Sequence, residues 1–145
     1  MRKNTINIFT LLVLIGCAGS SMTTSKYKSR VFTASYENTF ESTVDYFQER
    51  GFQINKANLS SGDIETDYRE GAGWATRSMT NRRAKVTGKV IQVSDQETKL
   101  TLTIISEERS EMSGWFQVEM NVGKEQFYYK RYFESIENRI KSKGR

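Results

Sequence analysis

The chain has 145 residues, with 22 Lys and Arg against 17 Asp and Glu, 37% hydrophobic residues and 27% charged residues. This length and composition predict one globular domain with tails and leave no room for two full cores. The sequence contains no histidine and one cysteine, Cys17. These absences exclude histidine-based catalytic triads, histidine metal sites and internal disulfides. We therefore expect neither a metal nor another cofactor.

The first sixteen residues carry the pattern of an export signal. Arg2 and Lys3 precede a mostly apolar run over residues 6–15. That run is too short to cross a hydrocarbon core of about 30 Å as a helix, and a cationic start followed by a short apolar run is typical of a signal peptide. A plain secretory signal with an incidental cysteine, and a buried apolar helix, remain the alternatives to a lipoprotein signal.

The apolar run ends in Leu14-Ile15-Gly16-Cys17, which resembles the lipobox of bacterial lipoprotein precursors. The resemblance implies cleavage between Gly16 and Cys17, a diacylglycerol on the Cys17 thiol and acylation of the new amino terminus. Residues 1–16 are then a lipoprotein signal peptide. Two or three acyl chains, at about 0.8 kcal/mol per buried CH₂, would hold the mature chain permanently in a membrane.

A tether is predicted over residues 17–26, which are small and polar and have no hydrophobic period. About ten such residues reach up to ~35 Å when stretched, so the domain would stay close to the membrane. Ala18, rather than Asp, follows Cys17, and the resemblance to enterobacterial sorting implies the periplasmic face of the outer membrane. Loss of Arg2 and Lys3 leaves a net charge of +3, which is too small to indicate a nucleic-acid partner.

Residues 27–145 are predicted to form a single α+β domain. A strand over residues 27–34 precedes a helix that starts at Asn38, with Glu41 completing a capping box. Gly51 suits the left-handed position that ends this helix, where Phe52 could fold back onto Phe47. The apolar face of the helix is expected to be Phe40, Val44 and Phe47.

The remaining elements are five strands and a second helix. Residues 52–55 and 64–68 form a hairpin, and alternation of apolar and polar residues then predicts strands near 84–90, 100–104 and 116–122, with a turn over 94–97. The last helix runs from about 124 to 142, and its apolar stripe is Tyr129, Phe133, Ile136 and Ile140. The order β-α-β-β-β-β-β-α predicts an antiparallel β-meander with both helices packed on one face.

Three short stretches resemble the helix-grip-like domains of small envelope lipoproteins such as BamC of the outer-membrane β-barrel assembly machine. They are the helix end at Gly51-Phe52, the strand entry at Gly62-Asp63-Ile64, and Arg82-Arg83 before an alternating strand. The resemblance covers residues 27–140 and implies a fold, not a function.

One set of carboxylates could serve an enzyme. Asp63, Glu65 and Asp67 share one face of the predicted strand, at a separation that a glycosidase could use. This pattern allows a cell-wall hydrolase, whereas a solvated strand face is the ordinary interpretation of the same spacing. We assign no catalytic residue and expect a non-enzymatic protein.

Several Arg residues and both Trp residues could form a surface that contacts a partner protein. These residue types are enriched at interfaces, and a stretch over residues 69–83 combines them with flexible glycines. The same stretch could instead be a solvated loop, with its Trp tucked against the core. The candidate contact residues are Arg69, Trp74, Arg77, Arg82, Arg83 and Trp115, and Tyr128 and Tyr132 could add a second patch or form the rim of the core.

The sequence leaves three functions open. The first is a membrane-anchored accessory or interaction module that binds an envelope protein. The second is a carrier of a lipid or small ligand, which needs a groove of about 300 Å³ between helices and sheet and would be removed by a filled core. The third is the hydrolase. The residues that would fill the carrier's groove are Phe40, Phe47, Phe133 and Ile136.

Overall fold

Residues 26–71 and 81–144 are described by the computed structural model, so the predicted lipidation site at Gly16 and Cys17, the tether up to residue 25, Trp74 and Arg77 lie outside the described residues. The described chain forms an α+β domain, as predicted. Its elements are η1 (Lys26–Lys28), β1 (Ser29–Phe32), α1 (Tyr36–Glu49), β2 (Ile54–Asn58), β3 (Asp63–Thr66), β4 (Arg69–Glu70), β5 (Arg82–Ser94), β6 (Glu97–Ser110), β7 (Gly114–Gln117) and α2 (Val122–Lys143).

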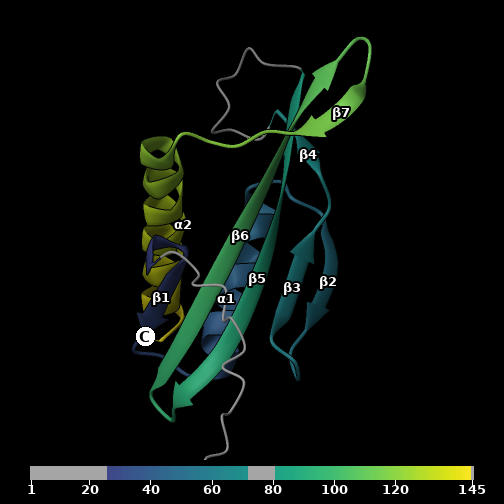
Figure 1. Ribbon diagram of the computed structural model, residues 1–145. Helices are drawn as coiled ribbons and strands as arrows, with labels where there is room; N and C mark the ends of the chain where they lie inside the picture. The colour runs from purple at the N-terminus through teal and green to yellow at the C-terminus, as the bar shows by residue number, and fades with distance from the viewer. Residues whose placement is uncertain (1–25, 72–80, 145) are drawn as a thin grey trace, which may run out of the picture.

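A long hairpin of β5 and β6 forms the centre of one antiparallel sheet (Figure 1). The strand order is β1-β6-β5-β3-β2, with β4 beside β5 and β7 beside β6. The predicted turn over 94–97 joins the two long strands. β1 pairs with β6 rather than with β2, because α1 carries the chain from one edge of the sheet to the other. Strand β4 was not predicted.

Both helices lie against one face of the sheet, with α1 directly behind the long hairpin in Figure 1. Alternate residues of β5 and β6, such as Val86 and Leu102, are buried beneath the helices, whereas Thr87 and Thr103 between them remain accessible. Phe47 of α1 and Phe133 of α2 belong to the same core cluster. No helix in the described ranges is long and apolar enough to cross a membrane.

Helix α1 starts one turn earlier than the sequence predicts. Ser35, not Asn38, caps its N-terminus, and the Ser35 hydroxyl oxygen accepts the Asn38 N–H at 3.2 Å. The Asn38 side chain instead donates to the Ile140 carbonyl of α2 at 3.3 Å. The predicted end is confirmed: Gly51 has a φ of +79°, and the Phe52 ring lies 5.8 Å from that of Phe47.

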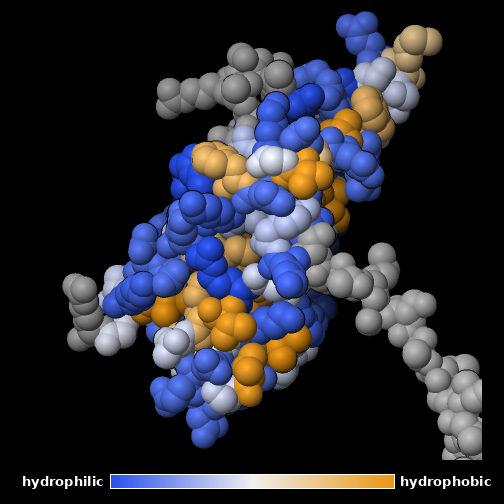
Figure 2. Space-filling model, turned by 60° about the vertical axis from the view of Figure 1, so that its left-hand side comes forward, coloured by the Kyte–Doolittle hydropathy of each residue, from blue (hydrophilic) through white to orange (hydrophobic). Residues whose placement is uncertain are grey.

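The predicted strand over residues 116–122 is too long. β7 ends at Gln117, and Val122 is already the first residue of α2. The helix starts there because the Asn121 side chain accepts the Gly123 N–H at 3.0 Å. Phe116 is 43% exposed because β7 belongs to a hairpin that projects beyond the helices (Figure 1). Figure 2 shows a largely hydrophilic surface with small, separate hydrophobic patches on the side of α2.

Candidate functional site

The sheet face opposite the helices carries accessible polar side chains. Its middle, on β3, β5 and β6, is a shallow hollow of about 380 Å³ whose floor includes Thr87, Thr101 and Thr103. Small β-branched residues in the middle of a sheet leave room above them, and Lys89 and Glu65 also line the hollow. This face, called the open face below, is therefore accessible in the part of the domain that the structure describes.

One end of the open face holds an arginine between two aromatic rings. The Arg83 guanidinium carbon lies 4.3 Å from the ring centroid of Tyr68 and 4.4 Å from that of Trp115. Glu107, opposite Arg83 in the β5–β6 register, accepts from Arg83 at 2.7 Å and from the Tyr68 hydroxyl at 2.6 Å. These four residues form the Arg83 stack, in which rings fix the cation from two sides and a carboxylate fixes it from a third.

Burial and hydrogen bonding hold the Arg83 stack in one protonation state at neutral pH. Burial, followed by the hydrogen bond to Glu107, raises the pKa of Tyr68 to about 12. The hydrogen bond from Tyr68, followed by that from Arg83, lowers the pKa of Glu107. The phenol therefore stays neutral as a donor, and the carboxylate stays charged as its acceptor.

The other predicted contact residues point elsewhere. Arg82 lies on the opposite face of β5 from Arg83, and its Nη2 and Nε contact Glu108 at 2.8 and 3.1 Å. Arg69 of β4 extends over the ring of Phe52, at 5.6 Å. The structure thus brings Arg83 and Trp115 together on the open face, whereas Arg82 lies on the opposite face of β5 and Arg69 lies beside Phe52.

The three strand carboxylates are held by lysines or lie in solvent. Asp63 accepts from Lys89 and from Ser61, both at 2.8 Å, and the Lys89 hydrogen bond is the main cause that lowers the Asp63 pKa to about 2. Glu65 accepts from Lys85 at 3.3 Å, and Asp67 follows the strand in an exposed position. A glycosidase acid requires a raised pKa, which is the reverse of the shift at Asp63.

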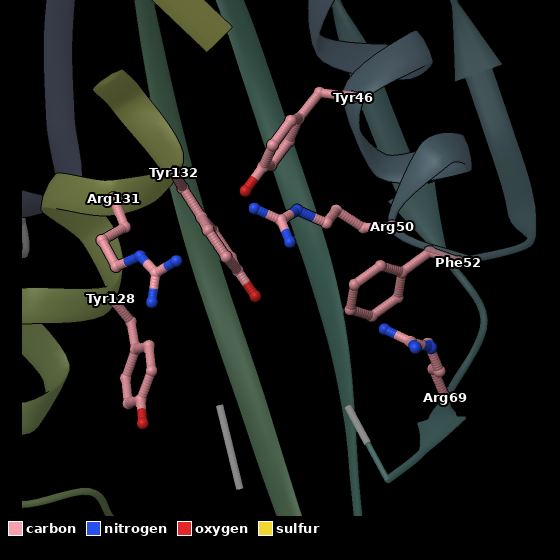
Figure 3. A pocket seen from close by; sticks show the side chains of 7 residues that line it. All are labelled: Tyr46, Arg50, Phe52, Arg69, Tyr128, Arg131 and Tyr132. Carbon is pink, nitrogen blue, oxygen red and sulfur yellow. The ribbon is translucent and has the colours of Figure 1, made fainter. Parts of the chain in front are cut away.

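A cavity of about 70 Å³ lies where the C-terminal end of α1, strand β4 and α2 meet (Figure 3). We call it the arginine–tyrosine pocket. Tyr132, predicted as a possible contact residue at the rim, is buried to 8% exposure in its wall. The helical spacing of Tyr46 and Arg50 is the only sequence feature that could have indicated the α1 side. The lining residues are Tyr46, Arg50, Phe52, Arg69, Tyr128, Arg131 and Tyr132.

The interior that a carrier would need is filled. Phe40, Phe47, Phe133 and Ile136 are each at most 6% exposed and belong to one core cluster. Their side chains occupy the space between the two helices and the sheet, at the place where the carrier hypothesis requires a groove.

No protein-family model matches the chain, and no curated protein sequence matches it. Among solved structures, the chain is similar to the adenylate sensor from AMP-activated protein kinase, crystallised in complex with ZMP. The similarity covers 78% of this chain and 94% of the sensor chain, with a TM-score of 0.45 and 10% sequence identity. At this level it assigns neither a family nor a ligand to the chain.

Proposed function

We propose that the chain is a lipoprotein anchored through Cys17 on the periplasmic face of the outer membrane, where it acts as a non-enzymatic interaction module of an envelope complex. The observation that carries the proposal is the Arg83 stack on the open face. The lipobox and the short tether supply the location, because they would hold the folded domain beside a bilayer.

The Arg83 stack suits a protein interface because its side chains are already fixed. Arg and Trp are the residue types that most often carry binding energy, and fixing a flexible side chain on association costs about 0.5–1.5 kcal/mol. Arg83 is held by Tyr68, Trp115 and Glu107 before any partner arrives. Binding a partner would therefore cost little further side-chain entropy at Arg83.

The charged groups of the open face support binding rather than catalysis. Asp63 and Glu65 are each paired with a lysine, and the hydrogen bond from Lys89 lowers the pKa of Asp63 to about 2. In the described ranges, no group of three or more His, Cys, Asp or Glu residues is placed to hold a metal ion. The proposal therefore gives the face no catalytic residue.

Site-specific photocrosslinking in the intact envelope tests the proposal. A photoreactive residue replaces Thr103, which is exposed on the open face, in the full-length chain made by its own organism. We expect one reproducible adduct with an envelope protein. Trp115→Ala should lower its yield about tenfold, because loss of an anchoring aromatic contact at an interface costs more than ~1 kcal/mol.

Two matched substitutions serve as controls. The same photoreactive residue at Gln126, exposed on α2, should give no such adduct, and Phe127→Ala, which removes a 54% exposed aromatic of α2, should leave the Thr103 adduct unchanged. An absent adduct at Thr103, or equal loss with both alanine variants, would contradict the proposed interface.

Mass spectrometry of the mature chain tests the anchor separately. A diacylglycerol on Cys17 as the first residue is the expected result, and Cys17→Ser should accumulate as unprocessed precursor. An unmodified thiol or an intact Met1 would contradict the lipoprotein assignment while leaving the interface proposal to the crosslinking result.

A further inference from the structure

The arginine–tyrosine pocket gathers three guanidinium groups from separate elements. Arg50 follows the last turn of α1, Arg69 belongs to β4, and Arg131 lies on α2. Within the described residues, none of the three forms an ion pair, whereas Arg82 and Arg83 both bind glutamates at 2.8 and 2.7 Å. The pocket therefore concentrates positive charge that the described carboxylates do not balance.

Aromatic rings lie against all three cations, with the Arg131 guanidinium carbon 5.7 Å from the Phe127 ring centroid. The Arg50 guanidinium carbon lies 5.4 Å from the Tyr46 ring centroid, and that of Arg69 lies 5.6 Å from the Phe52 ring centroid. Gly51 allows the approach of Arg69, because a Cβ there would lie 3.3 Å from the Arg69 Nε. Contact with a ring face occupies no N–H group, so the guanidinium donors remain available to a ligand.

The Tyr46 hydroxyl is a buried polar group without a partner. Tyr46 is 4% exposed, and its hydroxyl oxygen forms no hydrogen bond in the described structure. Figure 3 shows the Tyr46 hydroxyl directed toward the Arg50 guanidinium, and the Tyr132 ring lying between Arg131 and Arg50. Burial raises the pKa of Tyr132, so this phenol also stays a neutral donor. An unsatisfied buried donor is unusual in proteins and is explained if a ligand supplies the acceptor.

The cavity has the size of a small oxyanion. Its volume of about 70 Å³ is several times the roughly 10–15 Å³ that a single water needs. The donors around it are guanidinium and phenol groups, and the rest of the wall is aromatic. Three guanidinium groups in this lining attract a compact anion and repel a second cation.

We propose that the arginine–tyrosine pocket binds a phosphate group, carried either by a membrane lipid headgroup or by a soluble phosphate ester. A phosphate presents acceptor oxygens in several directions and bonds bidentately with arginine, which fits donors that converge from α1, β4 and α2. A carboxylate offers two oxygens in one plane and can therefore accept hydrogen bonds from fewer of these donors. This inference is independent of the protein partner proposed for the open face.

Arginine side-chain NMR on the intact protein tests the site. The mature lipidated chain is held in dodecyl maltoside micelles, which contain no phosphate, and the Nε–Hε resonances are followed while inorganic phosphate replaces chloride at constant ionic strength. The resonances of Arg50 and Arg69 should shift and saturate. Arg109, on the β6–β7 hairpin outside the pocket, should not respond.

A second sample distinguishes the two sources of phosphate. Micelles that contain phosphatidic acid are compared with the lipid-free micelles, without added inorganic phosphate. Shifts of Arg50 and Arg69 in the lipid-containing micelles support a headgroup ligand, and shifts only with inorganic phosphate support a soluble ligand. No shift in either sample would overturn the proposal.

Tyr46→Phe separates a ligand-binding role from a structural one. Removing an unpartnered buried hydroxyl should leave the melting temperature unchanged or raise it, because nothing in the free protein loses a hydrogen bond. The affinity for inorganic phosphate should nevertheless fall about tenfold, since a charge-assisted hydrogen bond is lost. An unchanged affinity would contradict the role of this hydroxyl.

Arg50→Gln with Arg69→Gln tests the charge requirement. The double variant should abolish saturable binding of inorganic phosphate, while Arg109→Gln, which removes the same kind of charge elsewhere, should retain it. Both variants should keep the wild-type amide spectrum outside the pocket. Saturable binding that survives in the double variant would overturn the proposal.

Discussion

The hydroxyl of Tyr129, on α2, accepts the backbone N–H of Ile104 in β6 at 3.0 Å. Ile104 lies where β6 has no strand partner on that side, because β1 pairs with residues 98–101 and β7 with residues 107–110. A buried N–H in such a gap would otherwise be unsatisfied. One helix side chain therefore completes the hydrogen bonding of the sheet edge and also fixes α2 against it.

Tyr129→Phe should destabilise the domain by about 1–3 kcal/mol, because the buried Ile104 N–H loses the Tyr129 hydroxyl as its acceptor. Tyr132→Phe is the matched control, since the Tyr132 hydroxyl forms no hydrogen bond with the described residues; it should change stability by less than about 0.5 kcal/mol. Urea unfolding measures both, and hydrogen exchange at Ile104 should accelerate in the Tyr129 variant. Equal effects of the two substitutions would refute this role of Tyr129.

Gly62 is required by a close backbone approach as well as by its conformation. Its φ is +77°, and a Cβ there would lie 2.2 Å from the Val90 carbonyl oxygen and 2.8 Å from the Tyr36 hydroxyl. Gly114 has a similar φ of +72° with nothing within 4 Å of the added Cβ. Gly114→Ala should therefore cost about 1 kcal/mol, and Gly62→Ala at least ~2 kcal/mol more. Thermal unfolding of the two variants measures this difference in stability. Similar losses of stability would show that the close approach of Gly62 to the Val90 carbonyl does not require glycine.

Asp63 should titrate well below an ordinary aspartate. The Lys89 hydrogen bond, aided by Ser61, lowers its pKa from 3.8 to about 2. A lowered folded-state pKa means that the contribution to stability is present above pH 3.8 and is lost as the pH falls toward 2. NMR of the side-chain carboxyl carbon should show this pKa, and Lys89→Ala should raise it. Lys99→Ala, also on the sheet, should leave it unchanged; a normal pKa in the unmodified protein would contradict the ion pair.

Ionisation of Tyr68 should destabilise the domain at high pH. Burial and the hydrogen bond to Glu107 raise its pKa from 10 to about 12. Because the folded-state pKa is raised, the contribution of Tyr68 is fully present below pH 10 and is lost as the pH rises toward 12. Ultraviolet absorbance of tyrosinate measures the titration. Glu107→Gln should lower the pKa of Tyr68, and Glu108→Gln, on the opposite strand face, should not.

The structure also shows where local patterns were insufficient. The capping-box interpretation of Asn38 failed because Ser35, three residues earlier, has the extended backbone and the free hydroxyl of an N-cap. Alternation from Phe116 to Val122 predicted a strand, although Asn121 caps a helix within that stretch. In both cases a cap side chain, which acts through one hydrogen bond, decided the boundary against a weak periodic pattern.

The sequence by itself determined the α+β class, the end of α1 at Gly51 and Phe52, and the alternating strands on either side of the turn over 94–97. These features depend on periods of 2 and 3.6 residues and on the backbone freedom of glycine, which act within a few residues. Only the tertiary structure decided that β1 lies beside β6, that Arg83 sits between Tyr68 and Trp115, and that Arg50, Arg69 and Arg131 meet in one pocket. Those contacts join residues far apart in the chain. They follow from strand register and helix packing across the whole core, which no local pattern specifies.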